Sequence, residues 1–179
     1  MTPPAGLRTA HTYELTPSLL GGIRAFLDTA FDGEFGDEDW DHTLGGVHVL
    51  VRGEGGDLLA HGAVVQRRVV QAGRSYRVGY VEGVAVRADR RREGLGGRVM
   101  AALEDVVDRA YAFGALSASE SGAGLYASRG WDVWTGGISA LGPRGPLPLP
   151  DEEGGTYVRG GPDPHAGALL FDWRDGDIL

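Results

Sequence analysis

Three segments rich in β-branched residues follow one another in the first half of the chain, and only short turns separate them. Their apolar patterns and the glycine-rich turns between them predict three strands, at residues 47–51, 58–70 and 76–87. Strands joined by such short turns pair antiparallel, because a parallel connection needs a dozen or more residues. The sequence therefore predicts an antiparallel meander, and the rest of the fold has to pack around it.

Helical patterns stand on both sides of this meander. Apolar residues at helical spacing predict helices at residues 17–30, 95–110 and 123–129. Thr16 and Pro17 suit the start of the first helix, as a hydroxyl N-cap followed by proline at the first helical position. Gly130 suits the end of the third.

The rest of the chain is expected to alternate loops and short strands. The acidic segment 31–41 reads as a loop with a short helix. A short strand at 115–117, a hairpin of 131–134 with 138–141, an irregular proline-rich loop over 142–155, and final strands at 156–158 and 168–173 complete the prediction. This order of elements predicts an α+β, or mixed α/β, fold.

Composition narrows the classes of function. The 179 residues fit one domain over 1–179. The absence of cysteine excludes disulfides and thiolate chemistry, and the five histidines lack paired ligand spacing, so no metal is expected. All 17 cations are arginine, which excludes Schiff-base catalysis and a Walker lysine. The net charge of −8 disfavours nucleic acid and favours a cationic partner, and no membrane segment or signal peptide is visible, which predicts a cytoplasmic protein.

One loop has the residues of an anion site. The run Arg91-Arg92-Glu93-Gly94-Leu95-Gly96, followed by Gly97, precedes the second predicted helix. Free N–H groups at a helix N-terminus favour an anion, glycines let the backbone approach it, and arginines add charged hydrogen bonds. A diphosphate suits such a loop. A solvated basic turn is the alternative from spacing alone.

The loop and its context resemble those of the GCN5-related N-acetyltransferase (GNAT) superfamily, in which a Gln/Arg-x-x-Gly-x-Gly/Ala loop grips the pyrophosphate of acetyl-CoA. Four further runs are similar to the aminoglycoside 2′-N-acetyltransferases, and they lie at residues 39–46, 79–89, 125–131 and 172–177. The resemblance extends from about Tyr13 to the C-terminus. It implies the GNAT fold, a mixed and mostly antiparallel sheet that is splayed at its centre and flanked by helices, with acetyl-CoA as co-substrate and an aminoglycoside as acceptor.

The resemblance also implies catalytic roles. Glu82, in an apolar strand beside the unusual Gly83, matches the proposed base, which acts through water; an outward-facing strand residue is the alternative. Tyr126 matches the general acid that protonates the departing thiolate, and core packing is its alternative. A bulge at Gly83 would free the Val84 N–H to polarise the thioester carbonyl, while Val84 and Val86 pair with the pantetheine arm.

Binding residues are expected in two groups. The co-substrate is assigned to Val84, Ala85, Val86, Arg91, Arg92, Glu93, Gly94, Leu95, Gly96 and Gly97. The resemblance assigns the aminoglycoside to Glu34, Asp39, Glu82, Gly83, Ser117, Asp151, Glu152, Asp177 and Leu179. The acidic residues among them suit a polycation, because carboxylates must replace the water around its amines. Each acidic cluster alone could be solvated surface. The family has an aspartate at the position of Glu34 and a C-terminal tryptophan at that of Leu179.

Two other functions stay open. The acceptor could be another cationic amine, such as a polyamine, a peptide or a cell-wall amino sugar. A binding protein that sequesters the drug or senses acyl-CoA would hold ligand without changing its mass. A homodimer is also possible: Trp131 and Trp134 could form an exposed interface, or could equally be core.

Overall fold

The first helix begins where its capping residues predict. In the computed structural model, which describes residues 6–179, helix α1 spans Pro17–Ala30 and Thr16 accepts a hydrogen bond from the Leu19 N–H at 3.3 Å. A second cap opens the short helix α2 (Asp37–Thr43), where an Asp39 carboxylate oxygen accepts from the Gly36 N–H at 2.8 Å. The acidic segment is therefore a loop followed by a short helix, as predicted.

Contacts within the chain define two compact units. The first unit comprises the described residues up to Val65 together with Val81–Asp105, and the second comprises Gln66–Tyr80 and Val106–Leu179. Strands β3 (Leu58–Gln71) and β4 (Arg74–Val86) and helix α3 (Leu95–Ala110) each contribute residues to both units. The prediction of a single domain over 1–179 stays a prediction.

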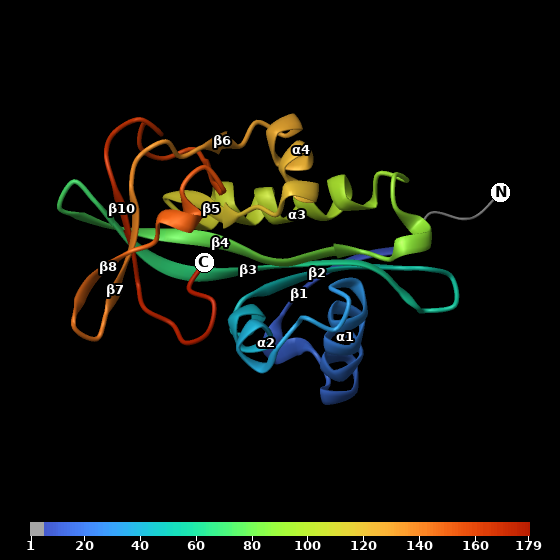
Figure 1. Ribbon diagram of the computed structural model, residues 1–179. Helices are drawn as coiled ribbons and strands as arrows, with labels where there is room; N and C mark the ends of the chain where they lie inside the picture. The colour runs from blue at the N-terminus through green and yellow to red at the C-terminus, as the bar shows by residue number, and fades with distance from the viewer. Residues whose placement is uncertain (1–5) are drawn as a thin grey trace. The chain divides into compact units, whose positions relative to one another are not determined.

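The first unit is a small antiparallel sheet with helices on its two faces. Strand β1 (Gly6–His11) pairs with β2 (Val47–Arg52), and β2 pairs with the first part of β3. Figure 1 shows α1 and α2 on one face of these strands and α3 on the other. The α1 face is sealed by a cluster of buried apolar side chains, namely Ala10, Leu15, Ile23, Leu27, Leu50 and Ala85. On the α3 face, a Cβ at Gly62 would lie 2.6 Å from Val99, so helix and strand pack closely there.

The second unit contains a longer mixed sheet with the strand order β6-β9-β5-β4-β3-β10-β7-β8. Its further elements are β5 (Phe113–Ser117), α4 (Glu120–Ser128), β6 (Asp132–Val133), β7 (Ile138–Gly142), β8 (Gly145–Pro148), β9 (Thr156–Arg159) and β10 (Leu169–Phe171). The β4–β5 and β7–β10 pairs are parallel, whereas β5–β9, β6–β9, β3–β10 and β7–β8 are antiparallel. The predicted mixed, mostly antiparallel sheet of an α+β fold is thus confirmed.

The parallel ladder between β4 and β5 is short. It joins three residue pairs and ends at Tyr80 and Ala115, while β5 continues to Ser117 in its ladder with β9. Residues Leu116 and Ser117 are therefore paired on the β9 side beyond the last β4–β5 pair.

Two predictions for the C-terminal half are wrong. Residues 131–141 do not form a hairpin, because β6 pairs with β9 and β7 pairs with β10 and β8. The proline-rich segment 142–155 is not wholly irregular either, since it contains β8 and a short 3-10 helix at Pro150–Glu152. Strand β8 tolerates two prolines because it stands at the end of the strand order, where one edge needs no N–H donors.

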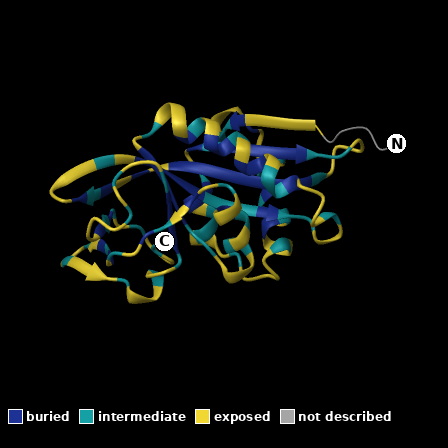
Figure 2. Ribbon diagram, turned by 90° about the horizontal axis from the view of Figure 1, so that it is seen from above, coloured by how far each residue is buried: buried dark blue, intermediate teal, exposed yellow. Residues whose placement is uncertain are grey.

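The two tryptophans near β6 belong to the core and not to an exposed surface. Trp134 is completely buried and Trp131 is 3% exposed, which corrects the alternative that they form an interface. Figure 2 shows the same pattern along the strands, which are mostly buried, whereas turns and outer helix faces are exposed. Helix α4 also begins at Glu120, three residues before its predicted start. Among residues 6–179, no helix combines the length and apolar character that crossing a membrane requires.

Candidate active site

The segment Glu82-Gly83-Val84 of β4 has an irregular backbone at its centre. Gly83 adopts a φ of +55°, a conformation that side chains other than hydrogen rarely allow. A Cβ at this position would lie 3.2 Å from Thr43 of α2 and 3.4 Å from Leu27 of α1. Glu82 and Val84 on either side are half-buried. The sequence signal at Gly83 thus marks a real distortion of the strand, next to the predicted base and the predicted oxyanion donor.

A pair of buried histidines reaches this distortion through His61, and sequence reasoning did not assign either of them to the site. His61 of β3 hydrogen-bonds through Nδ1 to the Gly83 carbonyl oxygen at 2.7 Å, and its Nε2 lies 3.0 Å from His48 Nδ1 of β2. Burial is the main cause that lowers the pKa of His61 to about 3 and that of His48 to about 4. A sequence signal existed, because both residues interrupt otherwise apolar strands.

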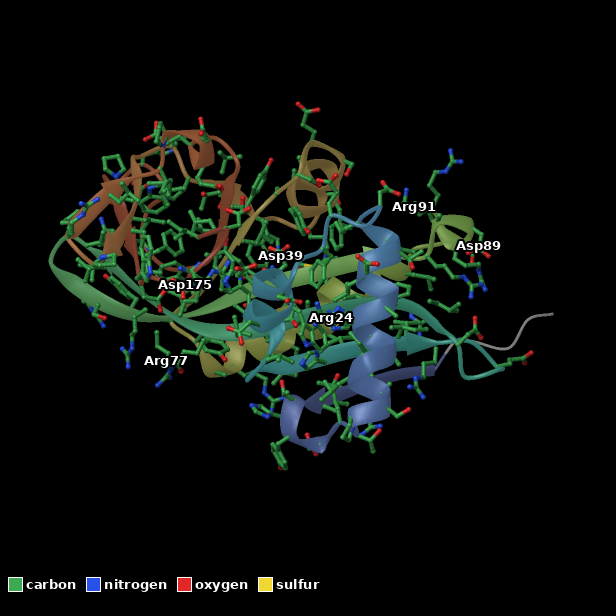
Figure 3. The ribbon with its side chains drawn as sticks, turned by 60° about the horizontal axis from the view of Figure 1, so that its bottom comes forward. Arg24, Asp39, Arg77, Asp89, Arg91 and Asp175 are labelled. Atoms are coloured by element: carbon green, nitrogen blue, oxygen red, sulfur yellow. The ribbon has the colours of Figure 1, made fainter. Side chains whose placement is uncertain are left out.

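The glycine loop before α3 contains two residues with left-handed backbone conformations. Arg92 and Gly94 have φ values of +64° and +79°, and α3, which has 16 residues, begins at Leu95. N–H groups in the first turn of a helix have no acceptor within the helix. Arg91 and Arg92 are exposed on this loop, and Asp89 lies in the short 3-10 helix Ala88–Arg90 that precedes it (Figure 3).

Glu93 is the one acidic residue within the predicted binding loop. Its carboxylate accepts two hydrogen bonds from Arg90 Nε, at 2.8 and 3.0 Å. This pairing lowers the pKa of Glu93, so the carboxylate is ionised but locally compensated. The pair leaves Arg91 and Arg92 as the exposed cations of the loop.

A hollow of about 290 Å³ in the second unit brings together predicted substrate residues from two distant segments. Asp151 and Glu152 come from the 3-10 helix at Pro150–Glu152, and Asp177 comes from the C-terminal segment. Ser117 at the end of β5 donates a hydrogen bond to Glu152 at 2.7 Å. Three residues of the predicted aminoglycoside site therefore line one acidic hollow, and a fourth, Ser117, contacts one of them.

Arg67 fixes the C-terminal segment beside this hollow. Its buried guanidinium donates to Asp172 Oδ1 at 2.7 Å, to the Asp172 carbonyl at 2.8 Å and to the Ile178 carbonyl at 2.7 Å. Arg174 donates to the same Ile178 carbonyl at 2.9 Å. The position of Asp177, between these anchors, is thus set by residues that sequence reasoning did not single out.

Tyr126 packs on α4 among aromatic side chains. It is 8% exposed, and its ring lies 6.5 Å from that of Trp131 and 6.1 Å from that of Tyr157. A Cβ at Gly122 would lie 3.1 Å from its ring, which explains the glycine one turn earlier. The tyrosine ring is therefore enclosed by side chains within the second unit.

The remaining predicted residues have mixed surroundings. Glu34 is exposed on the loop after α1, in the first unit. Asp39 is half-buried and caps α2. Figure 3 shows Asp39 on α2 and Arg24 on the neighbouring helix α1. The side chain of Leu179 is buried.

A larger hollow of about 540 Å³ lies in the first unit between β1 and the start of α1, and no predicted site residue lines it. Residues 6–179 bring together no group of three His, Asp or Glu side chains that could hold a metal ion.

Comparison with known proteins supplies a family for this arrangement. Residues 12–134 match the acetyltransferase (GNAT) domain family. The chain is 43% identical over 177 residues to the aminoglycoside 2′-N-acetyltransferase of Mycolicibacterium fortuitum, covering 96% of this chain and 90% of that protein.

Solved structures show the same fold at low sequence identity. The GNAT family N-acetyltransferase YhbS from Escherichia coli, solved in complex with CoA, superposes with a TM-score of 0.66 at 17% identity, over 96% of this chain and 91% of that one. A GNAT acetyltransferase from Brucella melitensis, solved with acetyl-CoA, gives 0.59 at 16% identity, over 92% and 95%. The chain thus belongs to the GNAT acetyltransferases and, within them, to the aminoglycoside 2′-N-acetyltransferase family.

Proposed function

We propose that this protein transfers the acetyl group of acetyl-CoA to the 2′-amine of an aminoglycoside. The observation that supports this most strongly is the 43% identity to an aminoglycoside 2′-N-acetyltransferase along nearly the whole chain. The acidic hollow adds chemical support, because a polycationic acceptor needs carboxylates in place of its water. The reaction class follows from the family, and the acceptor and its reacting amine are the proposal.

The loop before α3 fits the diphosphate of acetyl-CoA. Gly94 has open space where a Cβ would stand, so a ligand oxygen can approach the backbone there. The N-terminus of a 16-residue helix and two exposed arginines provide the complementary charge. In the proposal the loop residues hold the diphosphate, and Val84, Ala85 and Val86 hold the pantetheine arm through their backbone. These loop residues are Arg91, Arg92, Glu93, Gly94, Leu95, Gly96 and Gly97.

Three groups of the chain then serve the transfer. Bound acetyl-CoA supplies the acetyl group as an activated thioester. Glu82, through water, takes a proton from the acceptor ammonium so that the nitrogen lone pair can attack the carbonyl carbon. The Val84 N–H donates a hydrogen bond to the carbonyl oxygen, where negative charge develops. The Tyr126 hydroxyl gives its proton to the sulfur as the carbon–sulfur bond breaks.

The acceptor is proposed to bind through carboxylate side chains. Asp151, Glu152 and Asp177 would pair with ammonium groups, and Ser117 would hold Glu152 in place, as its 2.7 Å hydrogen bond indicates. Glu34, Asp39, Glu82, Gly83 and the C-terminal residue Leu179 complete the proposed set. Glu34 is one methylene longer than the aspartate expected there, so it would reach an acceptor amine from a different position.

CoA release tests the proposal with two drugs that differ at one position. Tobramycin has an amine at the 2′ carbon, whereas kanamycin A has a hydroxyl there. The proposal predicts rapid CoA release with tobramycin and little with kanamycin A. Equal turnover of both would exclude 2′ selectivity, and turnover of neither, with acetyl-CoA still bound, would indicate another amine or a binding role. Glu82→Gln serves as the reference for turnover that does not use the proposed base.

A further inference from the structure

A continuous chain of hydrogen bonds in the first unit ends at the distorted peptide of β4. The Thr12 hydroxyl lies 2.9 Å from His48 Nε2, His48 Nδ1 lies 3.0 Å from His61 Nε2, and His61 Nδ1 lies 2.7 Å from the Gly83 oxygen. The two imidazoles are completely buried. They are diagonal neighbours on one face of the β2–β3 ladder, in which His61 stands opposite Leu50.

The direction of every bond in this chain follows from its last acceptor. A carbonyl oxygen can only accept, so His61 Nδ1 carries the proton in its bond to Gly83. Because the lowered pKa keeps the buried ring neutral at physiological pH, His61 Nε2 has no proton and accepts. His48 must then donate from Nδ1 and accept at Nε2. The Thr12 hydroxyl must donate to His48, 2.9 Å away, and not to the Gly46 carbonyl oxygen, which lies 3.2 Å away and already accepts from the Thr12 N–H. The Gly45 N–H in turn donates to the Thr12 oxygen at 3.0 Å.

The opposite direction would require a charged histidine. If His48 donated from Nε2 to Thr12, its Nδ1 would need a proton from His61 Nε2, and His61 would then carry protons on both nitrogens. Burial opposes that charged form, as the lowered pKa values of both rings show. The chain is therefore fixed in one direction at neutral pH.

This directed chain sets the orientation of one peptide group. The Gly83 carbonyl and the Val84 N–H belong to the same planar peptide, and in a trans peptide the two bonds point in opposite directions. Holding the oxygen against the His61 ring therefore turns the Val84 N–H away from that ring. Thr43 and Leu27 close the space beside Gly83, with their side chains 3.2 and 3.4 Å from where a Cβ would stand.

We propose that His61, with His48 and Thr12 behind it, is a positioning residue that aims the Val84 N–H at the thioester oxygen. The proposal rests on the proposed function, because it assigns a role to the oxyanion donor of that reaction. It predicts that this hydrogen-bond chain stabilises the transition state, in which the charge on the thioester oxygen is largest. It predicts no effect on the binding of either substrate.

Two substitutions of His61 with side chains of similar shape distinguish a role in orienting the Val84 N–H from a role in packing. His61→Asn keeps a donor where Nδ1 stands, whereas His61→Leu has nearly the same shape and no donor. We expect His61→Leu to lower kcat with tobramycin about 10-fold or more, with both KM values within about two-fold of wild type, and His61→Asn to recover most of the loss. Equal kcat in the two variants, or wild-type kcat in His61→Leu, would overturn the proposal.

A second pair of substitutions, at the Thr12 end of the hydrogen-bond chain, tests the proposal if His61→Leu does not fold. Thr12→Val removes the donor to His48 with little change of shape, and Thr12→Ser retains it. The proposal requires a lower kcat for Thr12→Val than for Thr12→Ser at similar melting temperatures, and identical kcat values would refute it. Long-range ¹H–¹⁵N spectra of the wild type must show both imidazoles protonated at Nδ1 only; an Nε2–H form of either ring would also overturn it.

Failure of the proposed function is visible separately. If the proposed function is wrong, the wild-type protein releases no CoA with any aminoglycoside. The amide resonance of Val84 is then measured by NMR as acetyl-CoA is added. Aiming predicts a shift of this resonance in the wild type and in His61→Asn that is lost in His61→Leu. The same shift in all three proteins would refute the role of His61 whatever the acceptor.

Discussion

The buried Arg67 guanidinium is joined to Asp172 through a 2.7 Å bond from Nε to the carboxylate and a 2.8 Å bond to the backbone carbonyl. The cation also lies 4.9 Å from the ring centroid of Tyr80 and 5.1 Å from that of Phe171. This arrangement ties the C-terminal segment to β3. The acidic hollow that contains Asp177 therefore depends on Arg67 in β3, with Arg174 as a second anchor of the Ile178 carbonyl.

Replacing this arginine should destabilise the protein and loosen the hollow. Arg67→Met removes three hydrogen bonds to the C-terminal segment and leaves the Asp172 carboxylate partly exposed to water, which costs about 2 kcal/mol and lowers the melting temperature by roughly 6 °C. The KM for tobramycin should rise as Asp177 loses its fixed position. Arg68→Met is the matched control, because Arg68 is the exposed neighbour, and a similar loss in both variants would contradict this account.

Neutralising the carboxylates of the hollow should weaken acceptor binding. Glu152→Gln and Asp177→Asn each remove one charged partner of an ammonium, for which we expect about a 10-fold rise in the KM for tobramycin and a smaller change in kcat. Steady-state kinetics at two salt concentrations measure this, and the difference should shrink at high salt. Asp132→Asn, an exposed carboxylate of β6, makes the same change of charge elsewhere. If it raised KM as much, only net charge would matter.

A side chain at Gly83 should be poorly tolerated. Gly83→Ala combines the strain of a positive φ, about 1 kcal/mol, with the contact to Thr43 at 3.2 Å. Gly56→Ala has the strain alone, because Gly56 has a φ of +83° and open space around it. Urea unfolding should show the larger loss for Gly83→Ala, and only this variant should lose kcat. Equal behaviour would mean that the surroundings of Gly83 are not tight.

The buried histidine pair should make stability depend on pH. The pKa values of His48 and His61, about 4 and about 3, lie below the ordinary value, so the unfolded chain takes up protons first as pH falls. Stability is therefore full above about pH 6.5 and falls by up to about 1.4 kcal/mol per pH unit for each histidine below it.

Urea unfolding between pH 7 and pH 5 measures this slope. His61→Asn should have a shallower slope, since one of the two groups no longer titrates, while His165→Gln, at an exposed position, should leave it unchanged. A wild-type slope in His61→Asn would show that other groups dominate acid unfolding in this range.

Local patterns were enough to predict much of the fold. Patterns of neighbouring residues predict the helix after Thr16, the three strands from Val47 onward and the helix after the glycine loop. Each of these elements forms where its periodicity indicates. The partners of β6, β7 and β8 could not be read in this way, because β7 pairs with a strand some 30 residues away and β8 contains prolines that suggest a loop.

In the candidate site, too, some features could be predicted from the sequence and others could not. Gly83 could be noticed from sequence because glycine is unusual within a strand, and the structure gives it a positive φ. The histidine chain could not be predicted, since it depends on the register that brings His48 and His61 together across two strands. The acidic hollow likewise requires the anchoring of Asp177 through Arg67, which no local pattern records.

The position of the acetyl group on the product tests the central claim most directly. Tobramycin is converted with acetyl-CoA, and two-dimensional NMR of the product locates the new amide. The account predicts a single acetyl group on the 2′ nitrogen, with a mass increase of one acetyl group. Acetylation at the 6′ or 3 nitrogen, or a drug that binds with its mass unchanged, would contradict it.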